Sequence, residues 1–258
     1  MTGEIKANLY TELVGSMGYV IIDRPDSKNA MSQVMWDSLL PLCEALKVQG
    51  AKVIIIKSTG KTFCAGADLH ELTLIEGEAT ASSQWMSIKN ALDGLKAFSL
   101  PTIAQIQGAC LGGGCLLAMA CDLRYAGKPA WFSVPIAKLG IVLDDANIAR
   151  MASLIGPAKA KEMLYTGGTI SSAEAGPLGL VNKVVEEFEL ASYVSDIAAM
   201  IVQNGPASIL ETKNSIARIL KQTLPEGALS EFDHQSRVVG AYLSDDFRER
   251  ISKIENKN

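Results

Sequence analysis

Short apolar segments of strand character alternate with helical segments along most of this chain. The strand segments are residues 19–23, 52–58, 101–108, 122–127 and 179–185. They are bounded by Gly, Pro, Asp or Ser, residues that commonly punctuate strands. Strands that alternate with helices favour an α/β fold built in layers.

The helical segments carry start and stop signals of their own. Ser32 is placed to cap a helix over residues 33–49, and Gly50 to end it. From Glu187 onward the pattern is helical only, with Pro206 and Pro225 at helix starts. The sequence therefore predicts a core over residues 1–186 and a helical region over residues 187–258. Small polar residues at 73–83 predict a mobile loop near a ligand.

Composition excludes several classes of protein. The 258 residues carry a formal charge of −4, without the basic surplus that nucleic-acid binding requires. No apolar run is long enough to cross a membrane, and the first ten residues lack the order of a signal peptide, so we expect a cytoplasmic protein. The five cysteines form no CxxC pair, so we expect buried, reduced thiols and no metal site.

Three consecutive glycines, Gly112 to Gly114, lie within the stretch GACLGGGCLLAMACDL. No Lys-Ser/Thr pair follows them and the dinucleotide spacing GxGxxG is absent, which excludes the common nucleotide-binding loops. The pattern indicates a strand, a glycine turn and the start of an apolar helix, where free backbone N–H groups favour an oxyanion. Tight packing of the helix is the alternative reason for the glycines.

A second stretch, STGKTFCAGADLHEL at residues 58–72, also places small residues after a strand. Ala65, Gly66 and Ala67 form its expected turn. Two such turns can each direct one N–H at the same carbonyl oxygen, which is the minimum equipment of an oxyanion hole. Each donor of that kind is worth about 3 kcal/mol or more where water is excluded.

These two stretches, with DRPDSKNAMS before them and LGIVLDDANIAR after them, resemble the crotonase (enoyl-CoA hydratase/isomerase) superfamily over nearly the whole chain. The resemblance implies a spiral of ββα units with a C-terminal helical region. It also implies a homotrimer or a dimer of trimers, in which residues 187–258 serve trimerisation. The substrate would be an acyl-coenzyme A thioester, with coenzyme A as part of the substrate and no permanently bound cofactor.

The resemblance also assigns residues. The oxyanion donors would be the N–H groups of Ala67 and Gly113. Contacts to coenzyme A would fall at four further positions, namely Lys28, Ala65, Asp68 and Leu69.

The sequence departs from the family at the two positions where its hydratases carry glutamates. Leu116 and Ile136 stand there, and neither can transfer a proton, so both are expected to line the substrate pocket. Alignment through LG at residues 139–140 puts Asp144 where dienoyl-CoA isomerases of the family carry a catalytic aspartate. Asp144 is therefore the candidate base, and Asp145 the expected cap of the helix that follows.

Several functions remain open at this point. A single-acid enoyl- or dienoyl-CoA isomerase is the leading hypothesis. A decarboxylase of a malonyl- or glutaconyl-type thioester, on coenzyme A or a carrier protein, fits the loss of both glutamates, and so does a silent acyl-CoA-binding protein. Dehalogenation is disfavoured by an aromatic content of 6%. Trp85 and Lys89, four residues apart, are candidates for contact with the acyl chain.

Overall fold

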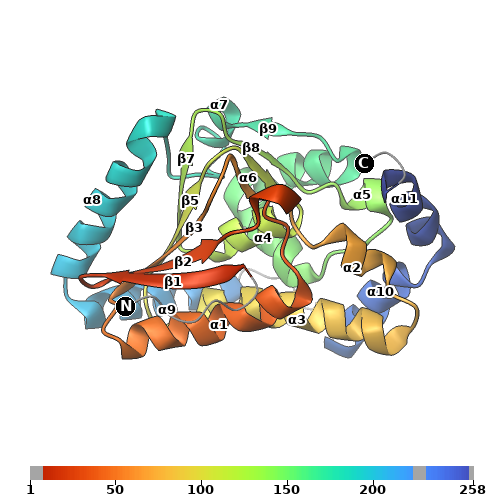
Figure 1. The fold of residues 1–258 in the computed structure, drawn as a ribbon, viewed down its shortest axis with the longest axis horizontal. Coiled ribbons are helices and arrows are strands. Elements are labelled where there is room, and N and C mark those ends of the chain that lie inside the picture. Colours follow the sequence, from red (N-terminus) through yellow and green to blue (C-terminus); the bar gives the residue numbers. More distant parts are fainter. Residues whose placement is uncertain (1–7, 223–230, 256–258) are drawn as a thin grey trace.

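The computed structural model describes residues 8–222 and 231–255. Pro225, which was expected to start a helix, lies outside these residues. Six strands form a larger sheet in the order β1-β2-β3-β5-β7-β10, and four form a smaller sheet in the order β4-β6-β8-β9 (Figure 1). The larger sheet comprises β1 (Leu9–Val14), β2 (Met17–Ile22), β3 (Val53–Ser58), β5 (Thr102–Ile106), β7 (Leu123–Gly127) and β10 (Lys183–Val185). The smaller sheet comprises β4 (Thr62–Cys64), β6 (Ala109–Leu111), β8 (Trp131–Ser133) and β9 (Ile170–Ser171).

The helices connect and cover the two sheets. They are α1 (Gln33–Val48), α2 (Leu69–Thr73), α3 (Glu78–Ala97), α4 (Gly113–Ala120), α5 (Ile136–Leu139), α6 (Asp145–Thr166), α7 (Ser172–Ala175), α8 (Leu190–Gln203), α9 (Pro206–Gln222), α10 (Glu231–Tyr242) and α11 (Asp245–Glu255). Two short 3₁₀ turns, η1 (Pro25–Ser27) and η2 (Glu187–Glu189), complete the described chain.

The chain alternates between the sheets in a regular way. A strand of the larger sheet is followed by a strand of the smaller one and then by helix, as in β5–β6–α4 and β7–β8–α5. The strands β2, β3, β5, β7 and β10 run parallel, and β1 pairs with β2 in antiparallel fashion. The expected α/β fold with a spiral of ββα units is confirmed.

Most of the expected local signals are present. All five expected strand segments contain a strand, and Ser32 caps α1 by accepting a hydrogen bond from the Met35 N–H at 3.4 Å. Pro206 begins α9. The five cysteines are free and buried, and burial raises the pKa of Cys43, Cys64 and Cys121 to about 12, so these thiols stay protonated.

The loop expected at residues 73–83 was wrong over most of its length. Helix α2 ends at Thr73, and α3 already begins at Glu78. Residues 78–83 are helical because Ala81 and Trp85, one turn apart in α3, are both buried against other elements. Tertiary packing therefore overrides the small polar composition of this segment.

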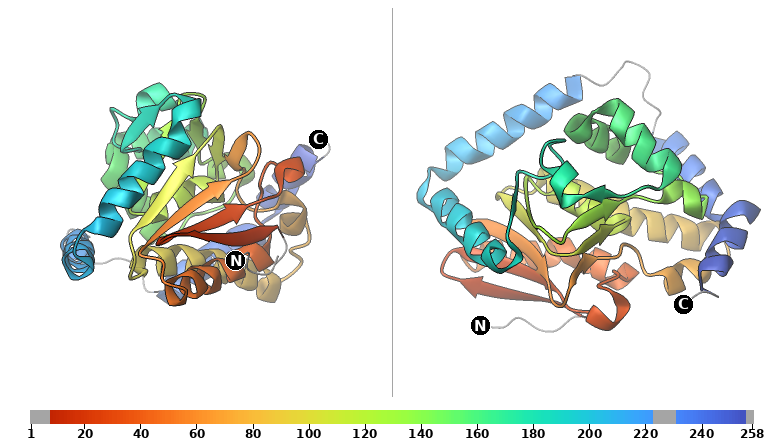
Figure 2. Two further views of the ribbon diagram at one scale, coloured as in Figure 1. Left: turned by 60° about the vertical axis from the view of Figure 1, so that its left-hand side comes forward. Right: turned by 90° about the horizontal axis from the view of Figure 1, so that it is seen from above.

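The helices after residue 187 occupy three separate places (Figure 2). Helix α8 buries Leu190, Val194 and Ala198 against the face of the larger sheet, in one cluster with residues of β3 and β5. Helix α9 runs along the edge of the molecule. Helices α10 and α11 return to pack against α3, α2 and α5, where they close a small apolar cluster.

Candidate active site

Two turns meet at one end of the smaller sheet. Strands β4 and β6 pair in parallel, so the turn after Cys64 and the turn after Leu111 lie side by side. A Cβ atom on Gly66 would lie 3.0 Å from the backbone nitrogen of Gly113, and one on Gly113 would lie 3.4 Å from the nitrogen of Ala67. The two expected oxyanion donors are therefore neighbours in space.

Both donors are available to a ligand. Gly113 is the first residue of α4, where a helix leaves its N–H groups without an intrahelical acceptor. Among the described residues, neither the Gly113 N–H nor the Ala67 N–H donates a hydrogen bond. The positive end of the α4 dipole adds to the attraction for an oxyanion at this point.

Two of the three glycines are also required by the structure itself. Gly112 has a φ of +49°, a backbone conformation that side chains rarely allow. At Gly114 a Cβ atom would lie 2.4 Å from the carbonyl oxygen of Cys64. Tight packing, the alternative considered for these glycines, therefore holds for Gly114, whereas Gly113 lies beside Ala67.

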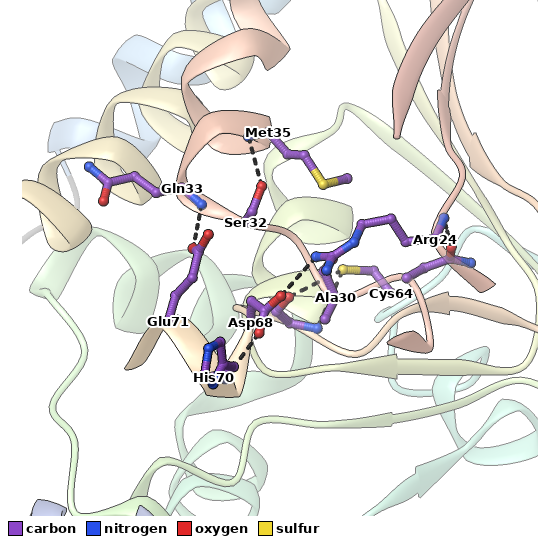
Figure 3. A network of polar contacts seen from close by, with 11 residues as sticks. Arg24, Ala30, Ser32, Gln33, Met35, Cys64, Asp68, His70 and Glu71 are labelled. Atoms are coloured by element: carbon purple, nitrogen blue, oxygen red, sulfur yellow. Dashed lines mark hydrogen bonds and ion pairs between the residues drawn. The ribbon is translucent and has the colours of Figure 1, made fainter. Parts of the chain in front are cut away.

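The turn that carries Ala67 is held by the segment before α1 (Figure 3). The Met31 N–H donates to the Gly66 carbonyl at 2.8 Å, and the Asp68 N–H donates to the Met31 carbonyl at 3.0 Å. Arg24 Nη1 lies 2.9 Å from Asp68 Oδ2 and 2.9 Å from the Ala30 carbonyl oxygen. Ala67 is thus flanked on both sides by residues with fixed backbone partners.

Asp68 also caps a helix. Its Oδ1 accepts a hydrogen bond from the His70 N–H at 3.0 Å at the start of α2. Glu71 in turn accepts one from the Gln33 N–H at 2.7 Å, which ties α2 to the start of α1 (Figure 3). His70 is exposed. Both Asp68 oxygens are therefore engaged within the chain, in a role that supports the turn.

A cavity of about 660 Å³ opens beside the two turns. The nine site residues expected from the sequence all line it, namely Lys28, Ala65, Ala67, Asp68, Leu69, Gly113, Leu116, Ile136 and Asp144. Trp85 and Lys89 line it as well, from α3. The structure therefore brings together residues that lie more than a hundred positions apart in the chain.

Asp144 is a buried carboxylate in this cavity, with 7% of the residue exposed. It caps α6, because its Oδ1 accepts a hydrogen bond from the Asn147 N–H at 2.8 Å. Its Oδ2 accepts a second one from Asn147 Nδ2 at 2.9 Å. The expectation that Asp145 is the cap was wrong, since the helix begins one residue earlier than the sequence suggested and Asp145 is its first residue.

Arg150 binds the amide oxygen of the Asn147 side chain. Its Nη1 donates to Asn147 Oδ1 at 2.6 Å, and its Nη2 lies 3.4 Å from Asp93 Oδ1. Burial lowers the pKa of the Arg150 guanidinium, while the charges of Asp93 and Asp144 oppose that shift. The Arg150 contact assigns the Asn147 amide oxygen, so the amide NH₂ group faces Asp144. The carboxylate is thereby held in one orientation.

The walls of the cavity are otherwise largely apolar. Leu116 is 4% exposed on α4, and Ile136 begins α5. The titratable residues that line the cavity in the described chain are Asp26, Lys28, Asp68, Lys89, Lys138, Asp144 and Tyr242. Asp68 is paired with Arg24, which leaves Asp144 as the carboxylate with buried surroundings.

Three lining or supporting residues were not expected from the sequence. Asn147 and Tyr242 line the cavity, and Arg24 supports the turn that carries Ala67. The i,i+3 spacing of Asp144 and Asn147 at a helix start was a usable signal for the first. Arg24 and Tyr242 carried none, because Asp68, which Arg24 binds, and most of the cavity wall, which Tyr242 joins, lie far away in the sequence.

The described residues, 8–222 and 231–255, contain no cluster of three His, Cys, Asp or Glu side chains arranged for a metal ion. In the same residues no helix combines the length and the apolar character needed to span a bilayer.

Comparison with known proteins places this fold in one class. A Xanthobacter autotrophicus enoyl-CoA hydratase/isomerase structure matches with a TM-score of 0.88 and 24% identity, covering 98% of this chain and 94% of the other. The family model for enoyl-CoA hydratase/isomerase matches residues 12–251. The chain belongs to the enoyl-CoA hydratase/isomerase family, whose enzymes act on acyl-CoA thioesters.

Two relatives show the breadth of this family. The Bacillus subtilis enoyl-CoA hydratase/isomerase family protein YngF is 35% identical over 226 residues, which cover 86% of each chain. The peroxisomal Delta(3,5)-Delta(2,4)-dienoyl-CoA isomerase of Arabidopsis thaliana is 33% identical over 251 residues, covering 92% of this chain and 89% of the relative.

Proposed function

We propose that this chain is a single-acid enoyl- or dienoyl-CoA isomerase. The observation that carries the proposal is the shared cavity, in which the free N–H groups of Ala67 and Gly113 and the buried carboxylate of Asp144 all face one space. An oxyanion site and one fixed base are the groups that a double-bond shift requires.

The two N–H groups would bind the thioester carbonyl oxygen. When a proton leaves the carbon chain, negative charge moves onto this oxygen, and the enolate gains more from the two donors than the neutral carbonyl does. Because the donors belong to the backbone of fixed turns, they need no rearrangement during the reaction.

Asp144 would carry the proton. The carboxylate removes a proton from the carbon alpha or gamma to the carbonyl, and the electron pair of that C–H bond enters the conjugated enolate. The same carboxylic acid then returns the proton to the other end of the conjugated system, so the double bond shifts and the net composition is unchanged. Asn147 holds the carboxylate in place through both of its oxygens.

The apolar walls favour this reaction over hydration. Addition of water to a double bond uses acid–base groups that position and activate the water, and Leu116 and Ile136 offer none. The dienoyl-CoA isomerase that is similar over most of both chains shows that the family includes enzymes of this kind.

Coenzyme A would enter as part of the substrate, across Lys28, Ala65, Asp68 and Leu69 at the rim of the same cavity. Lys28 supplies a positive charge from a backbone turn with a φ of +51°. No separate cofactor is needed for a proton transfer of this kind.

The proposed enzyme would be a homotrimer or a dimer of trimers. Helix α9 presents Ile216, Ile219 and Leu220 with 40% to 60% of each residue exposed, an apolar surface that a second copy of the chain would cover. Light scattering on the purified protein measures the assembly directly, and a monomeric mass would contradict this part of the proposal.

Hydrogen exchange in deuterated water tests the reaction itself. The enzyme should exchange an alpha or gamma proton of a suitable enoyl thioester, and Asp144→Asn should slow that exchange by about 10²-fold or more. Asn still accepts a capping bond, so the variant should stay folded and keep its affinity for the thioester. Asp145→Asn is the matched control and should exchange at the normal rate.

Other outcomes separate the remaining hypotheses. Carbon dioxide release from a malonyl- or glutaconyl-type thioester, unaffected by Asp144→Asn, would establish a decarboxylase instead. Thioester binding without exchange or turnover in a broad substrate panel would indicate a binding protein.

A further inference from the structure

The C-terminal helix α10 contributes a tyrosine to the wall of the cavity. Tyr242, the last residue of α10, is 7% exposed and lines the cavity together with Val238. Its ring meets that of Phe247 edge to face, with 5.4 Å between the ring centroids. Helix α10 packs along α3 (Figure 1), which places Tyr242 in one apolar cluster with Trp85.

The hydroxyl group of Tyr242 has no hydrogen-bond partner in the described part of the chain, and its oxygen is not among the unpaired polar atoms that are sealed from solvent, so it is open to the cavity. The other buried polar residues of the cavity differ in this respect, because Asp144 and Asn147 bond to each other. The indole N–H of Trp85, in the same cluster, is buried without an acceptor. This cluster therefore contains two donors and supplies no acceptor for either.

A bound ligand that displaced water from this hydroxyl without accepting its hydrogen bond would leave the donor unpaired in an apolar wall, which is costly, so the position favours a ligand with an acceptor there. Burial raises the pKa of Tyr242 to about 12, which keeps the phenol protonated as a donor at neutral pH. The thioester carbonyl is already assigned to Ala67 and Gly113. The Tyr242 hydroxyl is therefore available to another oxygen of the ligand.

We propose that Tyr242 determines specificity by donating a hydrogen bond to a second oxygen on the acyl group of the substrate. The class of substrate is then a hydroxyacyl, oxoacyl or carboxyacyl thioester with its double bond near the thioester. This inference rests on the proposed function, because it uses the same cavity and the same placement of the thioester.

Binding measurements on matched thioesters test the inference. Titration calorimetry compares butyryl-CoA, which has no second acyl oxygen, with 3-hydroxybutyryl-CoA, acetoacetyl-CoA and succinyl-CoA. The normal protein should bind at least one oxygenated thioester about threefold to tenfold more tightly than butyryl-CoA. Tyr242→Phe should remove that preference and leave the affinity for butyryl-CoA unchanged.

The control is Tyr165→Phe, which removes the same atom from a tyrosine that is 72% exposed and lies outside the lining. It should change none of the four affinities. Thermal unfolding of Tyr242→Phe verifies that the variant is folded.

Three results would overturn the inference. They are the absence of any preference in the normal protein, a preference that survives Tyr242→Phe, and an equal loss of affinity for all four thioesters, which would place the hydroxyl against the part of the ligand that they share. Each leaves the proposed isomerase intact. Failure of every thioester to bind, butyryl-CoA included, would overturn the proposed function and this inference together.

Discussion

The cavity is lined by two parts of the polypeptide that differ in kind, named the backbone end and the helical end. At one end, backbone N–H groups project from turns that follow strands of the smaller sheet, with Ala67 and Gly113 as donors. At the other, side chains from helices such as α3 and α10 form the wall, with Trp85 and Tyr242 among them. A backbone site depends on close packing of the turns, whereas a side-chain wall can change its chemistry by single substitutions. The first end suits a reaction step common to a family, and the second suits selection among substrates.

The largest expected effect comes from disturbing the packing at the backbone end. In Gly114→Ala the new Cβ atom would lie 2.4 Å from the carbonyl oxygen of Cys64 and 2.6 Å from its Cβ, so β4 and α4 must move apart. We expect a loss of about 3 kcal/mol in the free energy of unfolding, measured by urea denaturation.

A glycine on the helical wall is the matched control. Gly240 lies within α10 and a Cβ atom there meets nothing within 4 Å. Gly240→Ala should raise the stability by up to about 1 kcal/mol, because Ala favours the helix. Equal effects of the two substitutions would show that the two ends are not packed differently.

A smaller effect is expected from the support of the Ala67 turn. Arg24→Gln removes the contacts to the Asp68 carboxylate and the Ala30 carbonyl, and we expect a loss of about 2 kcal/mol in stability. The proton-exchange rate should fall more than the affinity for butyryl-CoA, because the oxyanion donor is displaced while the cavity remains. Exchange measurements and calorimetry on one preparation separate these quantities.

Arg248→Gln is the corresponding change on the helical side. Arg248 is 55% exposed and lies 3.9 Å from Asp245, so its removal should change the stability by less than about 0.5 kcal/mol. A normal exchange rate in Arg24→Gln would refute the supporting role of Arg24.

The smallest expected effect is a difference in stability between variants of two adjacent aspartates at the start of α6. Asp144→Ala removes the side-chain cap of the helix and should cost about 1 kcal/mol. Asp145→Ala should cost less than about 0.5 kcal/mol, because its ion pair with Arg237 spans 3.9 Å at the surface. Thermal unfolding of both variants measures the difference, and a larger effect at Asp145 would contradict the observed cap.

Much of the backbone end was predictable from local patterns. Runs such as VIIIKS specify buried strands, and glycines after a strand indicate a tight turn, so both donor turns could be found in the sequence. No residue range was predicted for strand β1 or for the short strands of the smaller sheet. Strands of two or three residues leave too little periodicity to detect, and they are stable only because neighbouring strands pair with them.

The helical end was less predictable, because it depends on contacts between distant segments. Residues 78–83 are polar enough for a loop, yet burial of Ala81 makes them helix. The choice between Asp144 and Asp145 as the cap depends on the exact residue where α6 begins, which local sequence specifies poorly.

The chain's local chemistry therefore established the strands, the glycine turns, the apolar residues at 116 and 136 and the presence of a carboxylate nearby. Folding in three dimensions decided that Asp144 is held by Asn147, that Arg24 braces the Ala67 turn, and that Tyr242 faces the same cavity from α10. The physical reason is how far apart in the sequence the interacting groups lie. Backbone preferences and periodicity act over a few residues and can be recognised in sequence, whereas hydrogen-bond partners and cavity walls are assembled from segments whose approach depends on the packing of the whole molecule.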